Sequence, residues 1–184
     1  MRMSYLILLF SGLSVISVAC FSQNSTRYTN VKCIEMSPSY VTFKQCHLKV
    51  LGRGVIALTI QAVLLKDPIT NAKVNLALFR KYNGFQPYLL KATFDFCKIV
   101  SKSNYRFSVE KIFIDAILPF SNINHSCPYK DEIYIKNIVF KEEFLKFIPL
   151  PSGEYQIQLF TFSDNILRAK VYVNFERIEE LMKV

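Results

Sequence analysis

The sequence predicts an all-β fold, an antiparallel sandwich of short strands with a single inserted helix. Two patterns lead to this prediction. Runs rich in β-branched or alternating apolar residues recur along the chain, and clusters of Gly, Pro, Asn, Asp and Ser separate them at short intervals. One segment changes from the strand period to the helical period. We find no internal repeat and no second domain, so the strands are expected to form one two-sheet sandwich.

The expected strands follow one another between turn sequences such as Ser37-Pro38-Ser39 and Asn83-Gly84. The clearest strand is 72–80, where alternate residues are apolar and the residues between them are mostly polar. In chain order the expected strands are 31–36, 41–51, 55–65, 72–80, 87–96, 132–140, 154–162 and 166–175.

The inserted helix is expected close to the centre of the chain. Its apolar residues have the spacing of one helix face: Val109, Ile112, Phe113, Ala116 and Ile117. Ser103 or Asn104 could cap its start, and Pro119 stops it. A short helical turn is expected at 142–147, and a helical or frayed tail at 176–183.

Residues 1–20 have the features of a secretory signal peptide. Arg2 precedes an apolar run, which continues through small residues to Ala19 and Cys20. The run is too short and too rich in Ser and Gly for a convincing transmembrane span. We therefore expect a secreted, extracellular protein whose single domain comprises residues 21–184.

The cysteines and the glycosylation sequons fit an oxidising compartment. Of the five cysteines, removal of Cys20 leaves an even set: Cys33, Cys46, Cys97 and Cys127. An even set predicts two disulfides, for which three pairings exist. N-glycosylation sequons occur at Asn24, expected on a flexible lead, and at Asn124, expected in an exposed loop.

The stretch from Ser121 to Tyr134 combines several of these signals. The Asn124 sequon is followed by Cys127 and then by Pro128, which fixes φ and ends the loop. The stretch therefore predicts a loop that a disulfide ties to the rest of the fold.

The chemical groups of the chain argue against catalysis. Of the two histidines, His47 lies inside an expected strand and His125 lies within a sequon. Two histidines and four oxidised cysteines do not make a standard zinc site. The sequence contains no glycine-rich phosphate loop and no nucleophile-elbow motif. We expect no enzymatic activity, no metal and no cofactor.

The formal net charge is +9, with a pI near 9.3. Such a charge can give affinity for acidic lipid surfaces or anionic glycans. However, the basic residues are scattered from Arg27 to Lys183 and form no stripe. A solvated surface is the simpler interpretation, and no nucleic-acid partner is expected.

Large apolar side chains are abundant, with 16 Phe, 10 Tyr and no Trp. A two-sheet sandwich lined by such residues can hold an apolar ligand between its sheets, because small-molecule pockets are mostly hydrophobic. Strand and helix phase select the residues expected to line the interior and bind a ligand: Leu58, Ile60, Leu76, Leu78, Phe94, Phe113, Ile117, Ile157, Leu159, Val171 and Val173.

Five stretches of the sequence carry a resemblance to a known family. They are 29–33, 43–50, 94–97, 121–129 and 150–155, among which Ser-Asn-Ile-Asn-His-Ser-Cys-Pro-Tyr at 121–129 is very specific. The chain resembles an insect-restricted family of small secreted proteins catalogued as a domain of unknown function. The resemblance covers nearly the whole of residues 21–184.

A more distant resemblance is to the ML lipid-recognition superfamily, secreted sandwiches that carry sterols, glycolipids or other lipids between their sheets. The shared features are a Cys-x-Leu segment that leads through Gly into a strand and the Cys127-Pro128 pair that leads into another. The resemblance implies an immunoglobulin-like, ML-like β-sandwich, a lipid-like ligand and the pairings Cys33–Cys46 and Cys97–Cys127. The chain departs from the superfamily by lacking a cysteine near the C-terminus and by its inserted helix. Some related insect proteins are linked to chemosensory organs.

Two functions follow as hypotheses. The first is a monomeric extracellular carrier for a hydrophobic small molecule, such as a lipid, a sterol or a cuticular hydrocarbon. It could act in chemosensation and deliver its ligand to an extracellular receptor. The second is a secreted protein-interaction module with a filled core and an exposed aromatic surface at Tyr82, Phe85 and Tyr88. A large apolar cavity would favour the first hypothesis, and a packed interior the second.

Overall fold

The computed structural model describes residues 22–181 except 67, 102–107, 142–147 and 149. At 22–24, 101, 109 and 179–181 only the backbone is described. Within this part of the chain, the strands are β1 (Ser22–Glu35), β2 (Val41–Gly52), β3 (Val55–Leu64), β4 (Lys73–Lys81), β5 (Phe85–Asp95), β6 (Glu132–Val139), β7 (Gly153–Ser163) and β8 (Ile166–Leu181). The helices are α1 (Phe96–Ser101), α2 (Val109–Ile117) and the 3₁₀ turn η1 (Leu118–Phe120).

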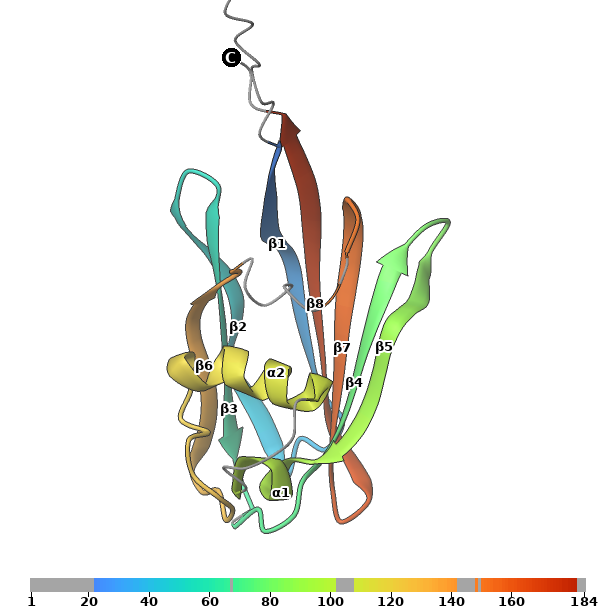
Figure 1. Ribbon diagram of the computed structural model, residues 1–184. Coiled ribbons are helices and arrows are strands. Elements are labelled where there is room, and N and C mark those ends of the chain that lie inside the picture. Colours follow the sequence, from blue (N-terminus) through green and yellow to red (C-terminus); the bar gives the residue numbers. More distant parts are fainter. Residues whose placement is uncertain (1–21, 67, 102–107, 142–147, 149, 182–184) are drawn as a thin grey trace, which may run out of the picture.

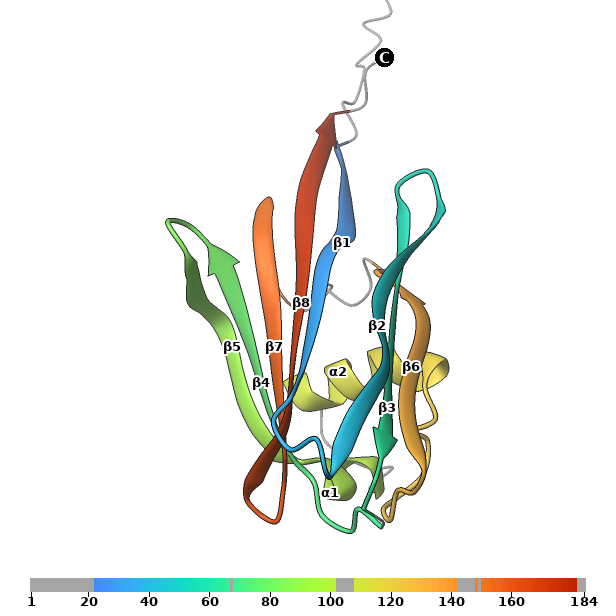
Figure 2. The same ribbon diagram turned by 180° about the vertical axis from the view of Figure 1, so that it is seen from behind.

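The strands form two antiparallel sheets that lie face to face (Figure 1). The larger sheet has the order β1-β8-β7-β4-β5, and the smaller sheet has the order β2-β3-β6. Helix α2 lies across one edge of the sandwich, between β5 and β6, whereas β1 and β2 are neighbours at the opposite edge (Figure 2). The predicted all-β sandwich with an inserted helix is confirmed.

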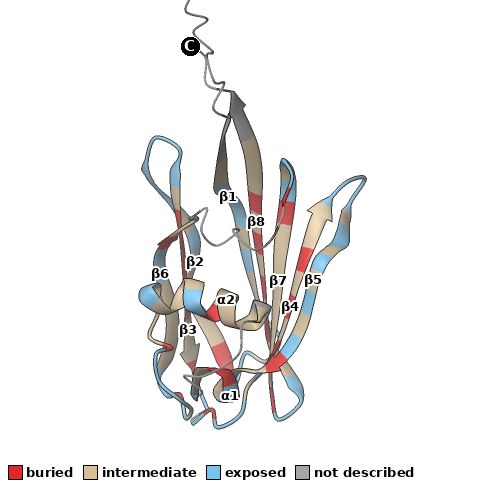
Figure 3. Ribbon diagram, in the orientation of Figure 1, coloured by how far each residue is buried: buried red, intermediate tan, exposed pale blue. Residues whose placement is uncertain are grey.

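Burial follows the strand period that the sequence predicts. In β4, Val74, Leu76 and Leu78 are buried, while the residues between them are not (Figure 3). Alternate side chains of a strand point to opposite faces, so these three side chains face the smaller sheet. At the centre of the larger sheet, the rings of Tyr155 and Phe175 are stacked with centroids 5.3 Å apart and are almost completely buried.

Two disulfides brace the sandwich, and their pairing is the one that the family resemblance implies. Cys33 of β1 is bonded to Cys46 of β2, so this disulfide joins the two sheets at one edge. Cys97 of α1 is bonded to Cys127 in the loop before β6. This second link holds the loop against the end of β5, as the stretch from Ser121 to Tyr134 predicts.

The first and last strands of the described chain are longer than predicted. Strand β1 begins at Ser22, so Asn24 lies in a strand and not on a flexible lead. Strand β8 continues to Leu181, and the expected helical or frayed tail is therefore strand over 176–181. The two strands pair with each other from Ser22 opposite Leu181 to Glu35 opposite Ala169. Their backbone hydrogen bonds depend on this partner, which local sequence propensity does not report.

The helical region also differs in detail from the prediction. Helix α2 starts at Val109, and its cap is Ser108, whose side-chain oxygen accepts a hydrogen bond from the amide of Lys111 at 3.3 Å. The alternatives Ser103 and Asn104 lie outside the described residues, as does the expected helical turn at 142–147. Helix α1 was not predicted. It begins where the Asp95 carboxylate accepts a hydrogen bond from the amide of Lys98 at 3.1 Å, which satisfies an amide of its first turn.

Candidate functional site

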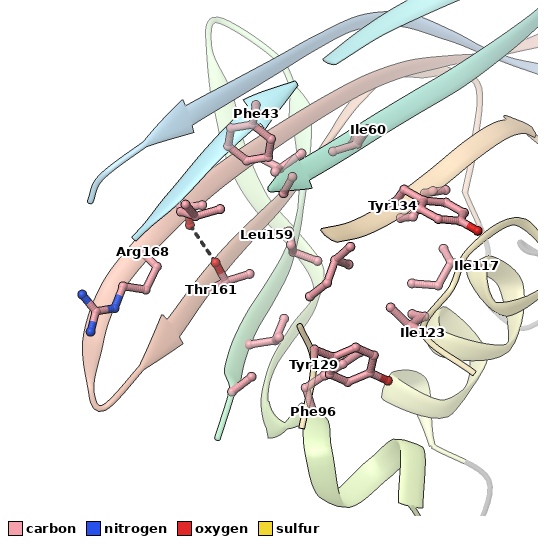
Figure 4. A pocket seen from close by; sticks show the side chains of 18 of the residues that line it. Phe43, Ile60, Phe96, Ile117, Ile123, Tyr129, Tyr134, Leu159, Thr161 and Arg168 are labelled. Atoms are coloured by element: carbon pink, nitrogen blue, oxygen red, sulfur yellow. Dashed lines mark hydrogen bonds between the residues drawn. The ribbon is translucent and has the colours of Figure 1, made fainter. Parts of the chain in front are cut away.

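A cavity of about 260 Å³ lies between the two sheets (Figure 4). This volume is close to the lower limit of small-molecule pockets, roughly 300 Å³. Both sheets, α2 and the loop before β6 contribute to its wall. The lining side chains are almost all aliphatic or aromatic, and the other groups are Thr161, Ser163 and Arg168.

Most of the side chains selected from strand and helix phase meet at this cavity. Nine of the eleven line it: Leu58, Ile60, Phe94, Phe113, Ile117, Ile157, Leu159, Val171 and Val173. The remaining two, Leu76 and Leu78, are 2% and 4% exposed but do not belong to the lining. They belong to the packed core, Leu76 in the same buried cluster as Ile114 and Leu78 in the same buried cluster as Tyr155. Contact of any of these residues with a ligand remains a prediction.

Several lining residues were not among those predicted. Ile133 and Ile135 of β6 face the cavity, and the alternation of the expected strand at 132–140 could have identified them. Ile114 also lines the cavity and is 2% exposed, although the helical spacing had placed Ile112 and not Ile114 on the apolar face. Tyr129 lines it from an irregular loop, where no periodic pattern exists to predict its direction.

The hydroxyl groups of Tyr40, Thr161 and Ser163 in the wall are bonded within the protein. The Tyr40 hydroxyl donates to Oγ of Ser163 at 2.9 Å, and Thr161 Oγ1 donates to the carbonyl of Ala169 at 3.5 Å. The Arg168 guanidinium lies over the Tyr40 ring, 4.0 Å from its centroid, and points away from the side chains that gather around the cavity in Figure 4. The surface offered to an occupant is therefore mainly apolar.

Tyr129 is a buried part of the cavity wall and is fixed by several contacts. Its backbone exchanges two hydrogen bonds with Ile69, of 2.9 and 3.1 Å. Its ring lies 5.7 Å from that of Phe96, and its hydroxyl donates to the carbonyl of His125. Burial raises the pKa of Tyr129 to about 12, so the side chain is neutral at physiological pH. The Cys97–Cys127 disulfide anchors the loop two residues before Tyr129 to α1.

The two histidines do not form a reactive group with each other. His125 is exposed, its ring stacks on that of Tyr129 at 4.4 Å, and its Nδ1 lies 2.7 Å from the carbonyl of Ser126. His47 is exposed on β2. Among the described residues, no group of three or more His, Cys, Asp and Glu side chains could hold a metal ion. None of the helices in this part of the chain is long and apolar enough to cross a membrane.

The aromatic surface of the second hypothesis is only partly exposed. Tyr82 is 58% exposed, but Phe85 and Tyr88 are half-buried. The Tyr88 ring lies against Tyr155, with centroids 5.8 Å apart, and the Arg80 guanidinium lies over Tyr82, Tyr88 and Tyr155. Tyr88 thus packs against the rest of the fold. The expectation of three exposed aromatic side chains was therefore wrong for Phe85 and Tyr88.

A central segment of the chain, which contributes part of this wall, matches a known family. Residues 74–157 match a family described as a protein of unknown function (DUF1091). The DUF1091 match runs from β4 into β7 and includes α1, α2, β6 and the Cys97–Cys127 disulfide. The match supports a relationship to a domain family of unknown function. No curated protein matches the chain.

Proposed function

We propose that this protein is an extracellular carrier of a hydrophobic small molecule, such as a lipid, a sterol or a cuticular hydrocarbon. The observation that supports the proposal is the apolar cavity of about 260 Å³ between the sheets. A space lined by hydrocarbon offers water few hydrogen-bond partners, so it stays dry or takes up an apolar ligand. An apolar ligand gains dispersion contacts there and leaves water, which favours its binding.

The same wall supports binding without chemistry. The hydroxyls of Tyr40, Thr161 and Ser163 at the cavity bond within the protein, and most of the other lining side chains are apolar. Catalysis needs proton-transferring or charge-stabilising groups close to the reacting atoms. We therefore propose a carrier and not an enzyme, with recognition by shape and size.

Secretion is part of the proposal. Two disulfides are typical of proteins from oxidising compartments. Residues 1–20 have the pattern of a signal peptide, and the Asn124 sequon lies in an exposed part of the loop before β6. The ML-like assignment, the restriction to insects and a role in chemosensation rest on the sequence resemblance.

The experiment uses the disulfide-bonded protein from a secreting host. Native mass spectrometry should find an apolar adduct, and an apolar fluorophore should bind and be displaced by added lipids. Ala62→Leu adds bulk to the cavity wall in β3 and should weaken fluorophore binding about tenfold or more. Ala77→Leu makes the same change on β4, outside the cavity lining, and should leave binding unchanged.

Two results would overturn the carrier. One is the repeated absence of both an adduct and fluorophore binding. The other is an equal response of the Ala62 and Ala77 variants, because the cavity would then not be the binding site. Either result would favour the protein-interaction module, for which Tyr82→Ala is the first substitution to test.

A further inference from the structure

The turn between β2 and β3 exposes apolar side chains at one end of the sandwich. Every residue from Lys49 to Val55 is exposed, and Val50, Leu51 and Val55 are 72%, 51% and 40% exposed. A Cβ placed on Gly52 or Gly54 would meet no atom within 4 Å, so the turn projects freely from the protein. Exposed apolar groups that cluster in this way commonly mark an interaction site.

Basic residues lie close to these apolar side chains, and this part of the sequence contains no acidic residue. Lys49 precedes them, Arg53 lies among them, and Lys44 is exposed further along β2. The sequence has no Asp or Glu from Met36 to Lys66, which includes the whole of β2 and β3. Among the described residues, neither Lys49 nor Arg53 takes part in an ion pair. The positive charge of the turn is therefore available to a partner.

The turn between β4 and β5 points to the same end of the molecule (Figures 1 and 2). It carries Tyr82, which is 58% exposed, and a tyrosine with an apolar ring and a polar hydroxyl suits a membrane–water interface. On the neighbouring strands, Glu154 pairs with Lys81 at 2.8 Å and Glu176 pairs with Arg27. These carboxylates are neutralised within the protein.

We propose that the β2–β3 turn docks the protein on a membrane surface that contains anionic phospholipid. Val50, Leu51 and Val55 enter the interface, and Lys49 and Arg53 contact the lipid phosphates. A projecting two-strand turn offers little area, whereas a stable protein partner buries about 1,200 Å² or more. A lipid interface requires only a few apolar side chains together with nearby cations. The docking does not depend on whether the cavity holds a ligand. It would, however, bring a carrier to the membrane, in which apolar ligands dissolve.

The protein contains no tryptophan, so one introduced indole reports its own surroundings. Leu51→Trp places it on the β2–β3 turn. Ile166→Trp is the matched control, because Ile166 is 52% exposed on the β7–β8 turn at the opposite end (Figures 1 and 2). With vesicles of phosphatidylcholine and phosphatidylserine, the indole emission of the Leu51→Trp variant should shift to shorter wavelength and be quenched by brominated lipid. The control should not respond, and pure phosphatidylcholine should have a weaker effect.

The contribution of the basic residues to membrane binding is tested by vesicle co-sedimentation, with protein that carries no introduced tryptophan. Lys49→Gln with Arg53→Gln should weaken partition into anionic vesicles about fivefold for each cation removed. Lys66→Gln with Lys130→Gln removes the same charge at exposed positions after β3 and before β6, and should have a much smaller effect. Equal losses in the two double variants, equal responses of the two indoles, or no binding to anionic vesicles would each overturn the proposal. Self-association through Leu51 in the absence of lipid, measured by analytical ultracentrifugation, would likewise assign the turn to a second copy of the chain.

Discussion

Cys33 and Cys46 join the two sheets through a disulfide whose Cα atoms are 6.2 Å apart. Two residues further along β1, the Glu35 carboxylate accepts hydrogen bonds from the Thr42 hydroxyl at 2.7 Å and the Phe43 amide at 2.6 Å, both of β2. The same edge of the sandwich is thus closed by a covalent bond and by a charged acceptor.

Glu35 should make stability depend on pH at this edge. The hydrogen bonds from Thr42 and from the Phe43 amide hold the pKa of Glu35 below its ordinary value of 4.5. A lowered folded-state pKa contributes stability above pH 4.5, and this contribution is lost as the pH falls through the folded-state pKa. Glu35→Gln should therefore be less stable than the wild type at neutral pH, and the difference should shrink as the pH falls below 4.5. Urea unfolding at neutral and at acidic pH measures it. A difference independent of pH would contradict the prediction.

The two disulfides should differ in their effect on ligand retention. They close loops with sequence separations of 13 and 30 residues. Loop-closure entropy then predicts losses of about 3 and about 3.7 kcal/mol in unfolding free energy when each pair of cysteines is replaced by serine. Only the Cys97–Cys127 link holds the cavity wall around Tyr129, so its removal should speed fluorophore release under conditions in which the protein remains folded.

The control for that experiment is the Cys33→Ser, Cys46→Ser variant, compared at a matched fraction folded. Its fluorophore release should stay near the wild-type rate. If both variants released the fluorophore equally fast, the loop before β6 would not be the part of the wall that retains it.

The phase of α2 can be tested with one substitution at two positions. Ile114 is 2% exposed and lines the cavity, so Ile114→Ala should lower the unfolding free energy by about 2 to 4 kcal/mol. Ile112 is only half-buried and is not part of the lining, so Ile112→Ala should have a clearly smaller effect. Denaturant titration compares them. The opposite order would restore the helix face that the sequence spacing predicted.

The Tyr155 hydroxyl should contribute to stability apart from its ring. It donates to the carbonyl of Pro151 at 2.6 Å, and the residue is fully buried. Tyr155→Phe keeps the ring and leaves that carbonyl without this donor, so the unfolding free energy should fall by about 1 kcal/mol. Tyr88→Phe is the control, because its hydroxyl makes no hydrogen bond among the described residues. Similar losses in the two variants would show that the Pro151 bond contributes little.

The sequence predicts which side chains of a strand face the interior, because this alternation depends only on neighbouring residues of the same strand. Alternation in β7 and β8 predicted correctly that Ile157, Leu159 and Val171 face the interior. The same alternation could not separate Leu76 from Val74 two residues earlier, which lines the cavity while Leu76 is buried in the core outside the lining. Both side chains point to the same face of the sheet, and only the position of the opposite layer distinguishes them.

Fold class and strand phase could be predicted from the sequence, because each depends on a pattern of residues close together in the chain. The cysteines predicted two disulfides but left three pairings open. The folded protein was needed to assign β1 and β2 to different sheets, to show that Ile114 rather than Ile112 faces the cavity, and to place Tyr129 in its wall. These features depend on partners distant in sequence. Strand ends, helix orientation and loop direction are set by backbone hydrogen bonds and packing against those partners, for which a local pattern contains no signal.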